Sequence, residues 1–179
     1  GFKREQIQIE LAEYTINHQL EQILKDLYCR KPDVIGFSSY IWNISYIKCL
    51  LADIKKVLPE VKIWLGGPEV SYCGEEILRE QPVVDLVMKG EGEETFAQLL
   101  QVLVEKEGSG ASFSGYLEEI KQKGIPGLVF LDSQGNKDGA AWGTFAGGDR
   151  QAGWPVYDTG IRPPMDMNRI PFPYGFLEM

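Results

Sequence analysis

The chain has 179 residues, enough for one domain with a proper core and a further subdomain or tail. Hydrophobic residues make up 44% of it, charged residues 25%, and the formal net charge is −8. No apolar run is long enough to cross a bilayer, and the first residues do not resemble a signal peptide. The acidic balance disfavours nucleic acids and anionic membranes as partners, because phosphate binding needs clustered Lys and Arg.

The three cysteines, Cys29, Cys49 and Cys73, form no CxxC pair and have no zinc or iron–sulfur spacing, so we predict no metal site in this chain. An odd cysteine count without a secretory signal suits a reducing compartment, and we expect a cytoplasmic protein. The chain begins just before a strand-like pattern and stops at residues 176–179 without a closing helix. We therefore expect a fragment of a longer protein.

The first part of the chain alternates between strand and helix patterns. Residues 6–11 alternate polar and apolar side chains, which predicts a half-exposed strand. A helix is expected between Asn17, its proposed N-cap, and Pro32, which stops it. Residues 33–39 predict a buried strand that turns polar at its end, and the apolar spacing over 44–58 predicts the next helix.

The same alternation continues up to Gly108. Strands are expected at 61–65 and 84–88, and helices at 74–81 and over the residues that lead from Phe96 to Gly108. Such βαβ spacing predicts an α/β domain over residues 1–107, with a Rossmann-like (flavodoxin-like) parallel sheet and helices on both faces.

After Gly108 the pattern weakens. Residues 108–138 are expected to form a connector with one helix near 116–123, a strand at 127–131 and a small β-hairpin whose turn lies at 132–136. Residues 139–179 hold seven glycines and five prolines, so we expect no regular helix or central strand there. We predict an irregular C-terminal linker that lies on a surface through its aromatic side chains.

Ligands of open parallel sheets bind beyond the carboxyl ends of the strands, where three predicted loops meet: the first (38–43), the second (66–71) and the third (90–95). Small residues there leave room close to the backbone, and Gly36 opens space inside its strand. Glycines also simply turn a chain, so each loop alone leaves both interpretations open, but three adjacent loops favour a small-molecule site. The candidate ligand-binding residues are Gly36, Ser38, Ser39, Tyr40, Trp42, Asn43, Gly66, Gly67, Pro68, Glu69, Val70, Ser71, Gly90, Glu91, Gly92 and Glu93.

The third loop argues against a ligand with a pyrophosphate group. Glu91, Glu93 and Glu94 would repel a pyrophosphate, and neither GxGxxG nor GxxxxGK[ST] occurs in the chain. Helix capping alone explains these glutamates, although it leaves the flanking glycines unexplained. Ser38 stands where a receiver domain needs an aspartate, and His18, the single histidine, offers no Ser/His/Asp triad. We expect no catalytic residue in this chain, and an exposed His18 rather than a metal ligand.

The loop sequences resemble a known family. Residues 33–43, 65–71 and 90–96 resemble the cobalamin-binding domain of B12-dependent (class B) radical SAM enzymes, and 125–128 and 170–174 resemble the segment that joins it to the radical SAM barrel. The resemblance implies cobalamin bound base-off in this domain, with its nucleotide tail threaded between sheet and helices. It also implies a [4Fe-4S] cluster and S-adenosylmethionine in a downstream barrel of the same parent chain, with methyl transfer as a candidate reaction.

The resemblance also assigns roles to the candidate residues. Glycines and small residues would admit the tail, serines would donate hydrogen bonds to it, first-loop side chains would pack near the lower corrin face, and the third loop would line the rim. The tail residues would be Gly36, Ser38, Gly66, Gly67 and Ser71, the lower-face residues Tyr40, Trp42 and Asn43, and the rim residues Gly90–Glu93.

The chain departs from the family's patterns at several points. Ile16, His18 and Glu21 occupy the D, H and G places of D-x-H-x-x-G, so no protein histidine is expected on cobalt. Residues 6–11 correspond to the family's second strand, so its first strand and helix are missing, and CxxxCxxC is expected beyond Met179. The main alternative is a non-catalytic Rossmann-like module that binds another small molecule or a protein partner. A nucleotide-sugar domain of glycosyltransferase type ranks last, because its acidic metal motif is absent.

Overall fold

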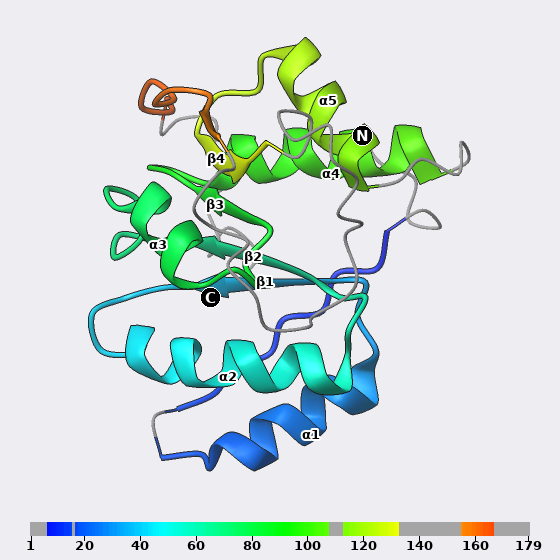
Figure 1. Cartoon of the computed structure of the whole chain (residues 1–179), viewed down its shortest axis with the longest axis vertical. Coiled ribbons are helices and arrows are strands. Elements are labelled where there is room, and N and C mark those ends of the chain that lie inside the picture. Colours follow the sequence, from blue (N-terminus) through cyan, green and yellow to red (C-terminus); the bar gives the residue numbers. More distant parts are fainter. Residues whose placement is uncertain (1–6, 16, 108–112, 133–154, 167–179) are drawn as a thin grey trace, which may run out of the picture.

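The structure, a computed structural model, describes residues 7–15, 17–107, 113–132 and 155–166. A sheet lies between two helical layers (Figure 1). The elements in chain order are α1 (Leu20–Arg30), β1 (Val34–Ser38), α2 (Ile44–Val57), β2 (Lys62–Gly66), α3 (Gly74–Glu80), β3 (Leu86–Met88), α4 (Glu93–Glu107), α5 (Phe113–Lys123), β4 (Leu128–Leu131) and β5 (Val156–Asp158).

The five strands form one sheet in the order β1-β2-β3-β4-β5. The first three are parallel, with Gly36 opposite Trp64 and Ser38 opposite Gly66, so the predicted parallel α/β core is confirmed. β4 then pairs antiparallel with β3, and β5 pairs antiparallel with β4. The sheet is therefore mostly parallel in its first part and gains two antiparallel strands from the region after α5.

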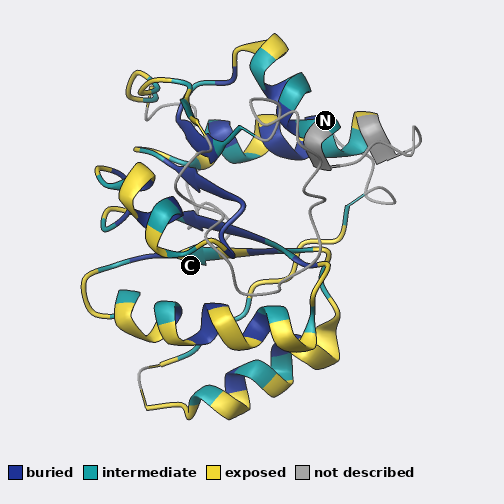
Figure 2. Ribbon diagram, in the orientation of Figure 1, coloured by how far each residue is buried: buried dark blue, intermediate teal, exposed yellow. Residues whose placement is uncertain are grey.

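Alternate side chains of the strands point to opposite faces of the sheet, and each face has its own hydrophobic core. In β2, Ile63 and Leu65 join the cluster under α1, α2 and α3, whereas Trp64 joins the cluster under α4 and α5. The buried residues accordingly run through the middle of the molecule, between the helical layers (Figure 2). Helices on both faces, as the sequence predicts, are what keeps these two apolar surfaces from water.

The predicted helices are present with small shifts at their ends. α1 begins after Gln19 rather than directly after Asn17, and it closes on Lys31 in a left-handed conformation (φ 48°), just before Pro32. The Lys31 backbone N–H donates to the carbonyl of Leu27 (3.2 Å), which satisfies one of the last carbonyls of the helix.

The strand predicted at 6–11 is wrong for the residues that the structure describes, since 7–11 form no strand. Ile9 and Leu11 are 66% and 86% exposed. An alternating pattern yields a strand only where a neighbour accepts its hydrogen bonds, and among the described strands β1 pairs with β2 alone.

The antiparallel pair predicted after residue 127 has a different second strand from the one expected. β4 confirms the strand at 127–131, but its partner β5 comes from the glycine- and proline-rich tail. The expected turn at 132–136 lies outside the described residues, apart from Asp132. β5 is a three-residue strand at the edge of the sheet.

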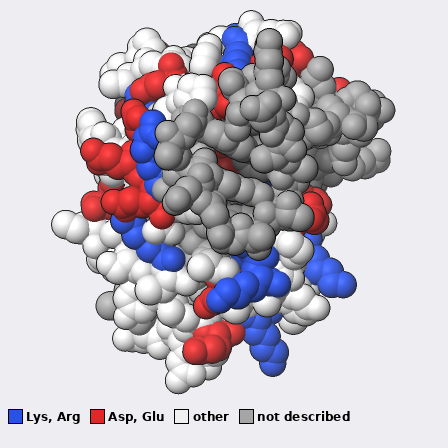
Figure 3. Space-filling model, in the orientation of Figure 1, with Lys and Arg blue, Asp and Glu red and all other residues white. Residues whose placement is uncertain are grey.

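The surface of the described residues is mixed in charge. On the face drawn in Figure 3, Lys and Arg side chains lie beside Asp and Glu side chains. Among the described residues, no helix has the length and apolar character needed to span a membrane.

Candidate functional site

The three glycine- and serine-bearing loops leave the same edge of the sheet, because β1, β2 and β3 are parallel. The first and second loops touch through their backbones: Ser39 N–H donates to Gly66 O (2.7 Å), and Glu69 N–H donates to Ser39 O (3.2 Å). Gly67 has φ +100°, and a Cβ there would lie 2.5 Å from the carbonyl oxygen of Ser39. Only glycine fits this crossing, so the glycine serves the junction between the loops.

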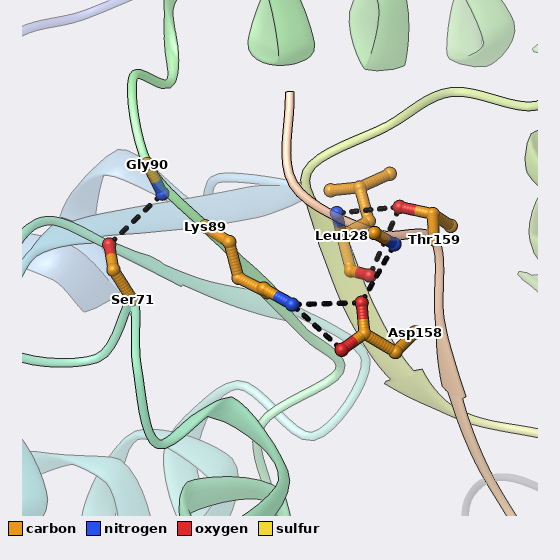
Figure 4. A network of polar contacts seen from close by, with 7 residues as sticks. Ser71, Lys89, Gly90, Leu128, Asp158 and Thr159 are labelled. Atoms are coloured by element: carbon orange, nitrogen blue, oxygen red, sulfur yellow. Dashed lines mark hydrogen bonds and ion pairs between the residues drawn. The ribbon is translucent and has the colours of Figure 1, made fainter. Parts of the chain in front are cut away.

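Ser71 joins the second loop to the third. Its hydroxyl donates to the carbonyl of Gly67 (2.9 Å) and accepts the backbone N–H of Gly90 (3.1 Å; Figure 4). The sequence suggested that this hydroxyl donates to a ligand, but its hydrogen is already used inside the protein. The contacts therefore favour a role for Ser71 in holding the two loops together.

The first loop is closed by Asn43. Its side-chain oxygen accepts Tyr40 N–H (2.7 Å), and its amide group donates to Ser38 O (2.9 Å). The closed loop presents the rings of Tyr40 and Trp42, which are stacked at 4.6 Å with 10° between their planes. Trp42 is 64% exposed, so the loop offers a flat aromatic surface to solvent at this end of the sheet.

A groove of about 2310 Å³ opens beside these loops and continues along the edge of the sheet. Its volume exceeds the ~300–1,000 Å³ of pockets that hold drug-sized molecules. On the α4 side, its floor includes Gly36, where an added Cβ would meet nothing within 4 Å. Trp64 and Phe96 line the same side, edge to face at 6.2 Å between ring centroids.

All the candidate residues except Ser39, Glu69 and Val70 line this groove. Ser39 and Val70 are fully buried beneath the loops instead. The residues that line it from the three loops and the adjoining strand are Gly36, Ser38, Tyr40, Trp42, Asn43, Gly66, Gly67, Pro68, Ser71, Gly90, Glu91, Gly92 and Glu93.

Two buried side-chain polar atoms have no hydrogen-bond partner in the described part of the chain: Ser39 Oγ and Trp64 Nε1. Buried polar groups are rarely left unpaired, and such atoms concentrate where a ligand completes the structure. Both belong to this end of the molecule, Ser39 beneath the first loop and Trp64 in the groove wall. Of the two, only Trp64 lines the groove, so its N–H is the donor that a ligand in the groove with a hydrogen-bond acceptor could satisfy.

Sequence reasoning missed Trp64, Phe96 and Arg162. Trp64 shares a sheet face with Gly36, which follows from strand alternation only once the β1–β2 register is known. Arg162 lies in the glycine- and proline-rich tail, yet its guanidinium reaches Glu94 (3.1 Å) and Thr95 Oγ1 (2.9 Å) at the start of α4. No local pattern in the tail indicates that contact.

His18 does not line the groove, although it bonds to Thr15, which does. His18 is exposed, and its Nδ1 accepts the N–H of Thr15 (3.0 Å). Among the described residues, no three His, Cys, Asp or Glu side chains come together in a way that would hold a metal ion.

The Ser71 bridge predicts a measurable stability effect. Ser71→Ala leaves the Gly90 N–H without the Ser71 hydroxyl and removes one of the two donors to the Gly67 carbonyl, which also accepts Val70 N–H, so the free energy of unfolding should fall by about 1–2 kcal/mol. Urea unfolding followed by tryptophan fluorescence measures this. Ser45→Ala, the same change at an exposed position of α2, is the matched control and should stay within ~0.5 kcal/mol of the unsubstituted chain. Equal losses in the two variants would contradict the bridging role.

Comparison with known proteins identifies the family that shares this sequence. The family model described as "B12 binding domain" matches residues 1–100. An uncharacterized methyltransferase of Pyrococcus horikoshii is 32% identical over 65% of this chain and 25% of its own length. The cobalamin-dependent radical SAM methyltransferase TokK of Streptomyces tokunonensis is 34% identical over 39% of this chain and 10% of its own. An anaerobic magnesium-protoporphyrin IX monomethyl ester cyclase of Cereibacter sphaeroides is 25% identical over 68% of this chain and 18% of its own.

The matched regions thus span a quarter or less of these relatives. The family match, by contrast, covers more than half of the chain and contains the three loops, β1 to β3 and the first half of α4. The sheet and the groove at the carboxyl ends of its parallel strands agree with that match. The chain belongs to the B12-binding domain family, and cobalamin is the cofactor that this membership supports.

Proposed function

We propose that this chain holds cobalamin base-off, with the nucleotide tail in the groove over Gly36 and the corrin ring at the rim formed by the three loops. The observation that carries the proposal is the open floor at Gly36. An added Cβ at Gly36 would meet nothing within 4 Å, and its partner in the strand register, Trp64, has a buried N–H without a hydrogen-bond partner among the described residues, which leaves space and a donor for an inserted ligand segment.

The rim suits the ring in its chemistry. The stacked Tyr40 and Trp42 rings offer an apolar face for a flat macrocycle, and Asn43 keeps them in place through its two hydrogen bonds within the first loop. Glu91 and Glu93 line the other side of the rim, where they disfavour a pyrophosphate and tolerate a ring with amide side chains.

The base-off part of the proposal follows from placing the nucleotide tail in the groove over Gly36, which holds its benzimidazole away from the cobalt. His18 is the chain's single histidine, and it is exposed outside the groove, so the cobalt would have no imidazole of this chain below it. When bound, cobalamin supplies a cobalt centre that accepts and passes on an alkyl group. The residues of this chain would orient the ring and keep its tail away from the metal.

The reaction belongs to the proposed parent protein. Relatives include a cobalamin-dependent radical SAM methyltransferase and a 2-(S-pantetheinyl)-carbapenam-3-carboxylate methyltransferase, each far longer than the region they share with this chain. We therefore infer a radical SAM barrel in the same parent chain, with a [4Fe-4S] cluster and S-adenosylmethionine, and methyl transfer as its reaction.

Loading with hydroxocobalamin tests the proposal. The 179-residue chain should keep the corrin absorbance after desalting, and it should bind cobalamin more tightly than cobinamide, which lacks the nucleotide tail. Electron paramagnetic resonance of the reduced, Co(II) form should lack the splitting from a coordinated benzimidazole nitrogen.

Loss of the corrin absorbance on desalting would contradict the proposal, and the nitrogen splitting would contradict the base-off state alone. A thermal-shift screen covers the alternative: stabilisation by nucleotides, without stabilisation by cobalamin or cobinamide, would favour a module for another small molecule.

A further inference from the structure

The end of β5 and the chain that follows it contact the third loop, the residue before it and the start of α4. We name residues 158–165 the brace. Its start is fixed to β4 and to the residues that flank it: Thr159 N–H donates to Leu128 O (2.9 Å), and Gly127 N–H donates to Gly160 O (2.8 Å). Lys89, the residue before the third loop, pairs with Asp158 at 2.7 Å (Figure 4). Burial works to raise the pKa of Asp158, but the bonds from Lys89 and from Gly160 N–H outweigh it and lower that pKa below its usual value.

The rest of the brace holds the third loop and the first turn of α4. The Arg162 side chain is only 10% exposed. Its guanidinium donates to Thr95 Oγ1 (2.9 Å), pairs with Glu94 (3.1 Å) and donates to Gln98. Further along, the backbone N–H of Met165 donates to Glu91 Oε2 (2.7 Å). Two of the three glutamates in this region are thus tied to the brace.

The third loop has little packing of its own. Gly90 has φ +69°, and an added Cβ at Gly90 or at Gly92 would meet nothing within 4 Å. Glycines without side-chain contacts keep the most backbone freedom, so ordering this loop costs entropy that contacts from outside it must offset. Those contacts are the Ser71 hydroxyl on one side, bonded to Gly90 N–H, and the brace on the other.

We propose that the brace holds the loop from Gly90 to Glu93 in the conformation that receives the corrin rim, with Arg162 as the positioning residue. This inference rests on the proposed function and extends it to a segment that follows the matched domain in sequence. Because Met165 N–H sets the place of Glu91, a displacement of the chain at residue 165 is passed on to the cofactor rim.

Two substitutions at Arg162 test the brace. Arg162→Ala should weaken hydroxocobalamin binding about tenfold, and should raise amide hydrogen exchange at Gly90 and Gly92, because the start of α4, where the loop ends, loses its contacts with the brace. Arg162→Lys keeps the charge but not the planar fork, so both effects should be intermediate, and this variant carries the test should the alanine variant fail to fold. Arg79→Gln, which removes an exposed guanidinium from its pair with Glu75 in α3, is the matched control and should bind within about twofold of the unsubstituted chain.

Amide exchange separates positioning from a general loss of stability, which would raise exchange throughout the sheet. Unchanged affinity in Arg162→Ala, or weaker binding with unchanged exchange at Gly90 and Gly92, would overturn the inference. Should the unsubstituted chain retain no cobalamin, the proposed function fails, while the exchange measurement still decides whether the brace orders the loop.

Discussion

Gly36→Val is expected to lower the affinity for cobalamin at least ~100-fold, or about 3 kcal/mol, while the fold stays intact. Gly36 lies opposite Trp64 on the α4 side of the sheet, and the position of an added Cβ is open space. Valine therefore meets no clash in the free protein, and it suits a strand better than glycine does. In the complex, the same space would hold the nucleotide tail, and the added isopropyl group would exclude it.

Gly36→Val should lower the affinity for cobalamin without lowering the stability of the free chain, which makes this variant informative. The free energy of unfolding should stay equal or rise by about 0.5–1 kcal/mol, because glycine in a strand interior is destabilising. A general structural defect would lower stability and affinity together. Urea unfolding of the free chain and titration with hydroxocobalamin measure the two quantities separately.

A graded series and a shorter ligand complete the design. Affinity should decline from Gly36→Ala to Gly36→Val to Gly36→Leu, following the volume added to the groove floor. Cobinamide, which lacks the tail, should bind each variant as it binds the unsubstituted chain. Equal losses of affinity for cobinamide and cobalamin would place the ring, not the tail, over Gly36. Unchanged cobalamin binding in the leucine variant would show that the groove floor at Gly36 is not part of the binding site.

The fold was predictable where a pattern is long and local. In α2, the apolar residues predicted by spacing, Ile47, Leu51 and Ile54, are buried against the sheet. The alternation of strands and helices then implies parallel strands, because a helix that packs back along the sheet returns the chain to the end at which the previous strand began. Isolated short segments gave no such signal: β5 has three residues, and it becomes a strand because β4 accepts and donates its hydrogen bonds.

The position of the candidate site could be predicted from the sequence, but the contacts between its residues could not. Parallel topology puts the three loops at one edge, and their small residues are visible in the sequence. The partners of Ser71 and Asn43 depend on how close the loops lie, which no sequence pattern gives. The Arg162 contact spans 67 residues from Thr95, a separation at which local patterns carry no information.

A buried ion pair beneath the sheet should have the largest effect on stability. Asp85 is 2% exposed, and its carboxylate accepts Ile63 N–H (2.7 Å) and lies 3.7 Å from Lys55 Nζ. Asp85→Ala leaves both a buried N–H and a buried ammonium without this partner, so the free energy of unfolding should fall by about 3–5 kcal/mol. Asp85→Asn keeps an acceptor for Ile63 N–H, so its free energy of unfolding should fall by less. Lys56→Met, at an exposed neighbour, is the control for urea unfolding.

The pair also predicts how stability varies with pH. Burial raises the pKa of Asp85, and the nearby Lys55 opposes that rise. Lys55→Met removes the cation, so the pKa of Asp85 should rise further. The folded state then keeps a proton that the unfolded aspartate releases, so the stabilisation is fully present below the unfolded pKa of aspartate and is lost as pH rises through the folded pKa. Urea titrations at mildly acidic and at neutral pH should show a steeper decline for Lys55→Met than for the unsubstituted chain.

A double variant separates buried charge from lost packing. Lys55→Met combined with Asp85→Asn removes both charges, keeps the long side-chain stem at 55 and keeps an acceptor for Ile63 N–H. It should therefore recover most of the stability that Lys55→Met loses at neutral pH, and its pH dependence should return toward that of the unsubstituted chain. If the double variant is as unstable as the sum of the single variants, the losses come from packing, and the interpretation of Asp85 as a carboxylate that needs its cation is wrong.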